Sequence, residues 1–171
     1  MLRHALLALT LALAAVALPA TGSAAEGDRP GLVRCANLTY ARNKTSVCFA
    51  HHFLADVQQK TNVWTAKKFD KAKMESQELF NFPFAVISGE GAFRLTEPQQ
   101  KNLRAYLTGG GFLVASPGCS SEPWRTSFRR EVAEIFPALK LTKIPFDHPI
   151  FHTVYDITEL KTKSKKVKAE L

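Results

Sequence analysis

Apolar and polar positions follow two different periods along residues 32–144. Two short runs, 83–91 and 112–116, are apolar with no polar face and lead into glycine or proline, which is typical of strands buried on both faces of a sheet. In the stretches between the apolar runs, apolar residues recur three to four positions apart, the spacing of a helix with one buried face. The pattern therefore predicts strands that alternate with helices.

Nine elements follow from this pattern. We expect strands at 32–41, 62–69, 83–91, 112–116 and 138–144, and helical segments at 46–61, 74–83, 95–111 and 122–136. Thr96 is expected to cap the third helical segment, with Pro98 in its first turn and Gly109–Gly111 at its end. Such an alternation predicts one α/β domain with a parallel sheet and helices on both faces.

The first 25 residues have a different character. Arg3 precedes an apolar run of 14 residues, Ala5–Leu18, which is shorter than the roughly 18 residues of a membrane span and typical of a secretory signal. Ser23 and Ala25 suit the −3 and −1 positions of a cleavage site. We expect cleavage after Ala25, export to the periplasm or the extracellular space, and no transmembrane span in the mature chain; an uncleaved anchor is the alternative.

The remaining sequence divides into a linker at 26–31, one domain at 32–160 and a lysine-rich tail at 161–171. After cleavage the chain keeps 22 basic and 15 acidic residues, a net charge of +7. The tail alone holds five lysines and one glutamate, which is +4 of that charge. Because the excess is local, we expect no nucleic acid among the partners, and an envelope ligand or protein instead.

Three cysteines are an odd number for an exported chain. Cys35 and Cys48 could pair, which would leave Cys119 as the third thiol. The alternative is three buried thiols, since cysteine is among the most buried residue types.

Three motifs resemble a known family. They are S-G-x-G-x-F-x-L-T from Ser88, Y-L-x-G-G-G-F-L from Tyr106 and D-H-P-I-F-H from Asp147. Together they resemble the bacterial family called domain of unknown function 4159, over roughly Leu32–Ile157. The resemblance implies a flavodoxin-like, three-layer α/β/α fold with a mostly parallel sheet, similar to class I glutamine amidotransferases and to trehalose-utilisation-type domains.

The chain also departs from that family. Members usually continue past the D-H-P-I-F-H motif into a further strand and helix, so the chain is interpreted as a possible C-terminally truncated form of a longer member. Relatives often carry histidine at the position of Glu90 and acidic residues at the position of Ser116-Pro117.

A hydrolase or amidotransferase is the first hypothesis for function. When the turn of this chain is aligned with the nucleophile turn of the amidotransferases, the nucleophile position falls on Ser116 rather than on Cys119. Pro117 then stands where a backbone N–H would help to bind an oxyanion, and proline has none. His148 and His152 follow as candidate bases, although Pro149 between them favours a turn.

A metal site is the second hypothesis, and it rests on the histidines. Asp147, His148 and His152 are candidate ligands for zinc or a similar ion, while His51 and His52 point to different faces of a helix. The alternative is that Asp147 and His148 close a turn by side-chain hydrogen bonds while Ile150 and Phe151 pack. We expect no cofactor.

A binding module without catalysis is the third hypothesis and the one we favour. Ligands of parallel sheets sit at the carboxyl ends of the strands, and polar or small residues follow those ends here. Trp124 either lines the same crevice or belongs to the core. The expected ligand-binding residues are Gly89, Glu90, Gly91, Ser116, Asp147 and His148. The sequence therefore predicts a catalytically degenerate, exported amidotransferase-like domain.

Overall fold

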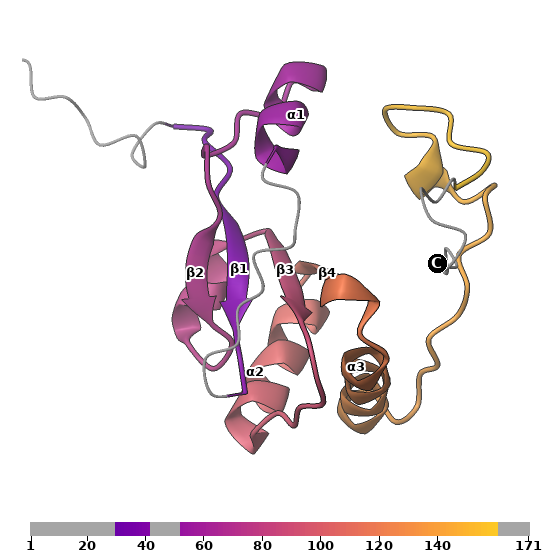
Figure 1. The fold of residues 1–171 in the computed structure, drawn as a ribbon. Coiled ribbons are helices and arrows are strands. Elements are labelled where there is room, and N and C mark those ends of the chain that lie inside the picture. The colour runs from indigo at the N-terminus through magenta and orange to yellow at the C-terminus, as the bar shows by residue number, and fades with distance from the viewer. Residues whose placement is uncertain (1–29, 42–51, 161–171) are drawn as a thin grey trace, which may run out of the picture.

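The computed structural model describes residues 30–41 and 52–160 (Figure 1). Its centre is a four-stranded sheet in the order β2-β1-β3-β4, with every neighbouring pair parallel. The strands are β1 Cys35–Thr39, β2 Asp70–Lys73, β3 Phe84–Gly89 and β4 Phe112–Pro117. The α-helices are α1 Phe53–Lys60, α2 Glu97–Thr108 and α3 Glu122–Ile135, and the 3-10 helices are η2 Gln77–Asn81, η3 Gly118–Ser120 and η4 Pro149–Phe151. The predicted α/β architecture with a parallel sheet is confirmed.

One face of the sheet carries the main core. Ala36, Leu38, Ala85 and Ile87 are fully buried on this face, because alternate residues of a strand point to the same side. They pack in one cluster with Leu103 and Tyr106 of α2 and with Trp124 and Ile135 of α3. Figure 1 shows α2 and α3 as neighbours beside β3 and β4.

The opposite face of the sheet is covered by α1 at its amino-terminal end. Phe53 of α1 stacks on Phe84 of β3 at 5.6 Å between ring centroids, and Phe84 stacks on Phe112 of β4 at 5.8 Å. Phe112 nevertheless stays 49% exposed. Helices therefore lie on both faces, as the alternation of strands and helices predicts.

The second strand lies further along the chain than predicted. Residues 62–69 form only an isolated bridge, Val33 with Thr65, and β2 follows at Asp70–Lys73. An apolar run indicates a buried strand, but β2 is the edge of the sheet and only its Ala72 is fully buried. An edge strand can be polar because one side of it meets water.

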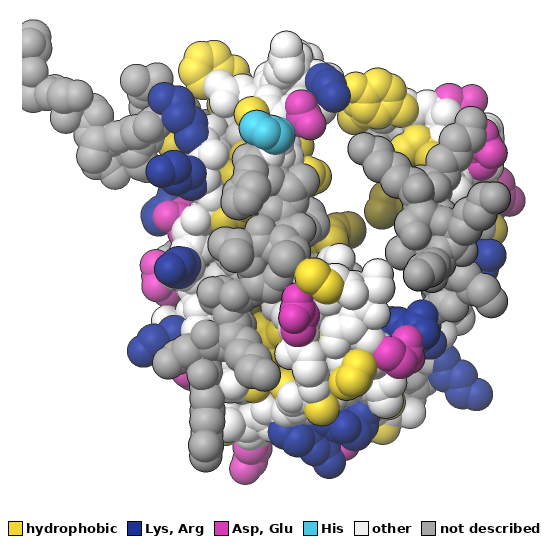
Figure 2. All heavy atoms as spheres, viewed as in Figure 1, with side chains coloured by type: hydrophobic (Ala, Val, Ile, Leu, Met, Phe, Trp, Pro, Cys, Tyr) yellow, Lys and Arg dark blue, Asp and Glu magenta, His cyan; other side chains and the backbone are white. Residues whose placement is uncertain are grey.

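The predicted strand at 138–144 is wrong, since these residues pair with no strand of the described sheet. A turn after α3, in which the Leu139 N–H donates to the Phe136 carbonyl at 3.0 Å, opens the segment instead. Leu139 and Leu141 are 67% and 58% exposed. Figure 2 shows open space between the C-terminal segment and the rest of the described residues.

The helix boundaries agree better with the prediction. α2 begins after Thr96, whose backbone N–H donates to Gln99 Oε1 at 3.2 Å, the reciprocal half of a capping box. It ends at glycines, and Gly110 has φ +94, a conformation that favours glycine. The segment 74–83 contains the 3-10 helix η2. Of the helix predicted at 46–61, residues 46–51 lie outside the described residues.

A buried carboxylate ties α3 to α2 and to the segment before α2. Glu131 of α3 is 1% exposed and accepts hydrogen bonds from Arg130 at 3.0 Å and from Gln100 at 2.9 Å. Arg94 lies 3.5 Å from the same carboxylate and 2.5 Å from Glu134, which raises the pKa of Arg94 and lowers that of Glu134. A buried charge is tolerated only with such partners.

Candidate functional site

The carboxyl ends of β1, β3 and β4 meet at one edge of the sheet. The chain leaves β1 toward β2 on one side and returns to β3 and β4 on the other, so the order reverses between β1 and β3. In open parallel sheets this point of reversal is where crevices form and ligands bind. The strand ends and the loops that follow them therefore define the candidate site.

A buried hydrogen-bond chain closes the point of reversal. Tyr40, next to the end of β1, donates from its hydroxyl to the Ser88 carbonyl of β3 at 2.9 Å. The same hydroxyl accepts from Nε1 of Trp124 in α3 at 2.5 Å. Tyr40 and Trp124 are each 1% exposed. We call this chain of three groups the tyrosine latch; it joins two strands and a helix at a single oxygen atom.

Gly89 is required at the latch because nothing larger than hydrogen fits there. A Cβ on Gly89 would lie 2.1 Å from the Tyr40 hydroxyl and 2.8 Å from Trp124 Nε1. Phe93 packs on both aromatic side chains, at 4.9 and 5.6 Å between ring centroids. Burial raises the pKa of Tyr40, so its hydroxyl stays a proton donor. The crevice is thus filled by side chains of the protein itself.

The loops after β3 and β4 are tied together above the latch. Gly91 donates its N–H to Ser121 Oγ at 3.0 Å and has φ +73. Gly118 packs against the loop after β3, since a Cβ there would lie 3.0 Å from Glu90 Cγ. Glu90 itself is exposed. The structure therefore brings Gly89, Glu90 and Gly91 together as a rim with one outward-facing carboxylate.

The turn after β4 separates the two candidate nucleophiles. Ser116 lies within β4, where it is the register neighbour of Ser88, and Pro117 is the neighbour of Gly89. The sharp bend comes later, at Cys119 with φ +47 and Ser120 with φ +58. Such values are uncommon for residues other than glycine. Cys119 is exposed, whereas Ser116 is half-buried.

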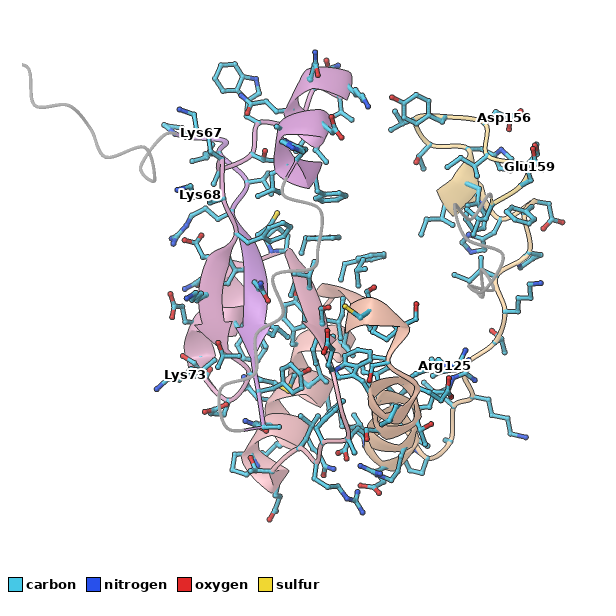
Figure 3. All side chains as sticks on the ribbon, in the orientation of Figure 1. Lys67, Lys68, Lys73, Arg125, Asp156 and Glu159 are labelled. Atoms are coloured by element: carbon cyan, nitrogen blue, oxygen red, sulfur yellow. The ribbon has the colours of Figure 1, made fainter. Side chains whose placement is uncertain are left out.

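The candidate histidines form a turn of their own. His148 Nδ1 accepts from the Ile150 N–H at 3.2 Å, and His152 bonds to Asp156 and to the Phe146 carbonyl. The hydrogen bond to Asp156 and the one to Phe146 raise the pKa of His152. The structure does not bring this turn to the rim: Asp156, labelled in Figure 3, lies on the C-terminal segment apart from the sheet.

The packing of this turn is only partly as expected. Phe151 packs on Phe146 at 5.3 Å between ring centroids, but Ile150 is 41% exposed. Asp147 is exposed. In the part of the chain that the structure describes, no group of three His, Cys, Asp or Glu side chains is arranged to hold a metal ion; His51 lies outside that part.

The cysteines have different surroundings. Cys35 is buried in β1, and burial raises the pKa of its thiol. Cys48 lies outside the described residues, and with it the predicted pairing.

The sequence reasoning missed the residues that assemble the site. The pattern predicts Tyr40 only as part of the first strand. Ser121 and Ser127 anchor the loop after β3 by accepting from the Gly91 and Phe93 N–H groups. Trp124 belongs to the core, as one of its two interpretations had it. One signal for this anchoring is present in the sequence: Ser127 is a small polar residue between Trp124 and Glu131 on the buried side of α3.

These features define the class of the protein: an α/β domain with a four-stranded parallel sheet and an aromatic closure at the carboxyl ends of its strands. The chain belongs to the family described as Domain of unknown function (DUF4159), whose model matches residues 34–170. No curated protein matches the chain. Within the described ranges, no helix has the length and apolar character to cross a membrane.

The latch predicts a specific coupling between Gly89 and Tyr40. Gly89→Ala should cost about 3 kcal/mol of unfolding free energy because of overpacking, and Tyr40→Phe about 2 kcal/mol because two buried groups lose a partner. The double variant should cost less than the sum by about 1 kcal/mol or more, since removing the hydroxyl relieves the closest clash. Urea denaturation measures all three values.

Tyr106→Phe is the matched control for this cycle. Tyr106 also buries a hydroxyl, which donates to the Phe82 carbonyl at 3.0 Å, but at the amino end of β3, about 20 Å along the strand from Gly89. Its effect should add to that of Gly89→Ala. Full additivity between Gly89→Ala and Tyr40→Phe would contradict the latch.

The His152–Asp156 pair predicts a pH dependence of the C-terminal turn. A histidine whose pKa is raised by folding stabilises the folded form below its ordinary pKa, and this contribution is lost as the pH rises through the raised value. The Ile157 N–H donates to the Phe151 carbonyl at 3.0 Å and reports on the turn. Its hydrogen-exchange protection, corrected for intrinsic rates, should fall as His152 deprotonates.

Asp156→Asn provides the control for this titration. It should lower the pKa of His152, measured by NMR of the imidazole ring, and flatten the pH dependence at Ile157. An unchanged His152 titration in this variant would show that the Phe146 carbonyl, not Asp156, sets the pKa.

Proposed function

We propose that the protein is an exported, catalytically degenerate relative of the class I glutamine amidotransferase fold that binds a ligand or a partner. The strand order supports the fold assignment, because β2-β1-β3-β4 is the order of the first four strands of a flavodoxin-like sheet. The family model extends over most of the chain. The apolar run at Ala5–Leu18 supports export, because its length matches a secretory signal.

One observation supports the binding role: the exposed carboxylate of Glu90 follows a backbone that hydrogen bonds hold in place. Glu90 follows β3 directly, and the tyrosine latch holds the end of that strand from below. The Gly91–Ser121 hydrogen bond holds the loop from the other side. A side chain fixed in this way loses little conformational freedom in its backbone when it binds.

The described candidate catalytic side chains do not meet, which favours binding over catalysis. Among the described residues, the hydrogen bonds of His148 and His152 stay within their own turn. Ser116 lies inside β4 and precedes Pro117, which has no N–H to stabilise an oxyanion. The remaining chemistry of the rim is that of a hydrogen-bond acceptor, suited to a cationic or a hydroxylated ligand.

NMR with two probe compounds tests the binding proposal. Arginine represents a cationic ligand and glucose a hydroxylated one. We expect one of them to shift the amide signals of Gly89, Glu90, Gly91 and Gly118 in a saturable manner. Glu90→Gln should abolish the shifts caused by arginine and weaken those caused by glucose, because the neutral amide accepts more weakly than a carboxylate.

Glu97→Gln is the matched control, since Glu97 is also exposed, at the start of α2, and the same charge is removed. It should leave the shifts unchanged. Shifts confined to residues away from the rim, or absent with both probes, count against the proposal.

The turn after β4 favours a hydrolase as the second candidate function. Cys119 is exposed, has a left-handed backbone and lies between a strand and a helix, the arrangement in which hydrolases present a nucleophile. In this alternative Ser116 or Cys119 attacks the substrate, and His148 or His152 would have to move to reach it as a base or as a metal ligand.

Alkylation rates separate the two candidates. If the domain only binds, iodoacetamide should label Cys119 no faster in the folded protein than in urea. A catalytic thiol would react about tenfold faster or more, because the thiolate is the nucleophile. Mass spectrometry of the peptide that contains Cys119 measures the rate, and a fluorophosphonate probe examines Ser116 in the same way. Cys119→Ser is the control for site assignment.

A further inference from the structure

The two edges of the described sheet differ in chemistry. β2 forms one edge with the sequence Asp-Lys-Ala-Lys, and charged residues of this kind protect an edge from further pairing. Lys67, Lys68 and Lys73 lie along this side in Figure 3. β4 forms the other edge with the sequence Phe-Leu-Val-Ala-Ser-Pro, and residues 112–121 carry no charged side chain. Charged side chains therefore do not protect the β4 edge from an added strand.

The backbone groups available on this edge follow from the pairing of β4 with β3. The Phe112 N–H donates to the Pro83 carbonyl at 3.0 Å, so Phe112, Val114 and Ser116 direct their backbone groups toward β3. Leu113 and Ala115 then direct theirs away from the sheet. Pro117 has no N–H and ends the usable edge. An added strand of about five residues would satisfy these groups.

The C-terminal segment has the sequence of such a strand. Residues 139–144 read Leu-Lys-Leu-Thr-Lys-Ile. In a strand, Leu139 and Leu141 lie on the same side, with Lys143 at its end. Both leucines are more than half exposed in the described structure. If they added to the sheet, the two leucines would extend the face that α2 and α3 cover, beside Leu113 and Ala115.

Charge also matches the segment to the edge. Lys140 and Lys143 are the charged residues of 139–144. Two acidic side chains lie near the carboxyl end of β4: Glu90, against Gly118, and Glu122, the first residue of α3, which is paired with Arg125.

We propose that the β4 edge binds residues 139–144 of a second copy of this chain, and that two copies exchange these segments. After the turn between Phe136 and Leu139, the segment runs apart from the sheet of its own copy (Figure 1). The apolar side chains therefore stay exposed until a second edge meets them. Each copy supplies one segment and one edge, which closes a two-fold dimer. This inference is independent of the ligand-binding role of the rim.

The size of the contact sets its strength. A segment of six residues is about 20 Å long, and two exchanged segments bury on the order of 1,000 Å² in total, near the lower limit of specific interfaces. The dimer is therefore weak and depends on concentration.

Sedimentation and hydrogen exchange of the mature chain test the proposal between about 1 μM and about 300 μM, a range that spans weak dimers. We expect a monomer at the low end and a dimer at the high end. The amides of Leu113 and Ala115 should gain protection as the dimer forms. Leu141→Lys should raise the dissociation constant about tenfold or more, because an exposed apolar contact is replaced by a charge.

Leu160→Lys is the matched control, because Leu160 is also exposed, at 42%, and the substitution is the same. It should leave the dissociation constant of the dimer unchanged. A synthetic peptide of residues 138–145 should dissociate the dimer, while a scrambled peptide should not.

Three results would overturn the proposal. The first is a monomer at every concentration with fast exchange at Leu113 and Ala115. The second is protection of these amides that is independent of concentration and lost in Leu141→Lys, which would place the segment on its own sheet. The third is a dimer that Leu141→Lys does not weaken, which would place the interface elsewhere.

Discussion

The arrangement of the domain depends on one oxygen atom, the hydroxyl of Tyr40. It donates to the Ser88 carbonyl at the end of β3 and accepts from Trp124 at the start of α3. A shift of β3, of α3 or of the end of β1 would therefore break at least one of these hydrogen bonds. A buried polar group without partners costs about 1–3 kcal/mol, and here each group satisfies the others. Gly89 is a consequence of this contact, because the hydroxyl occupies the space that a side chain would need.

The latch also explains why the carboxyl ends of the strands form a rim rather than an open crevice. Aromatic side chains fill the space that a ligand would otherwise enter, as the contacts of Phe93 with Tyr40 and Trp124 show. Polar chemistry is then left only above this layer, at Glu90 and in the loop held by Ser121. Recognition at such a surface depends on a few exposed groups held in place by a packed base.

The sequence predicted the buried parts of the fold well and the exposed parts poorly. β3 is apolar because neighbours cover it, and α2 carries its own capping residues, so both are visible in the chain. β2 is an edge strand with one buried residue, Ala72, and has no such signal. The segment 139–144 has the alternation of a strand, but a pattern states only which residues prefer burial, not which surface receives them.

In the candidate site, the sequence predicts the residues that follow a local pattern and misses those that depend on long-range contacts. The glycines around Glu90 were found because a strand that runs into glycine is a local pattern. Tyr40 and Trp124 are 84 positions apart, and the sequence around each residue carries no pattern that predicts the hydrogen bond between them. The contact is made possible by the parallel sheet, which brings the end of β1 beside that of β3, and by α3, which packs on the core face of the sheet. The site therefore depends on the order of the strands in the sheet. The residues that hold it in place are buried aromatic side chains, whereas Glu90 faces the solvent.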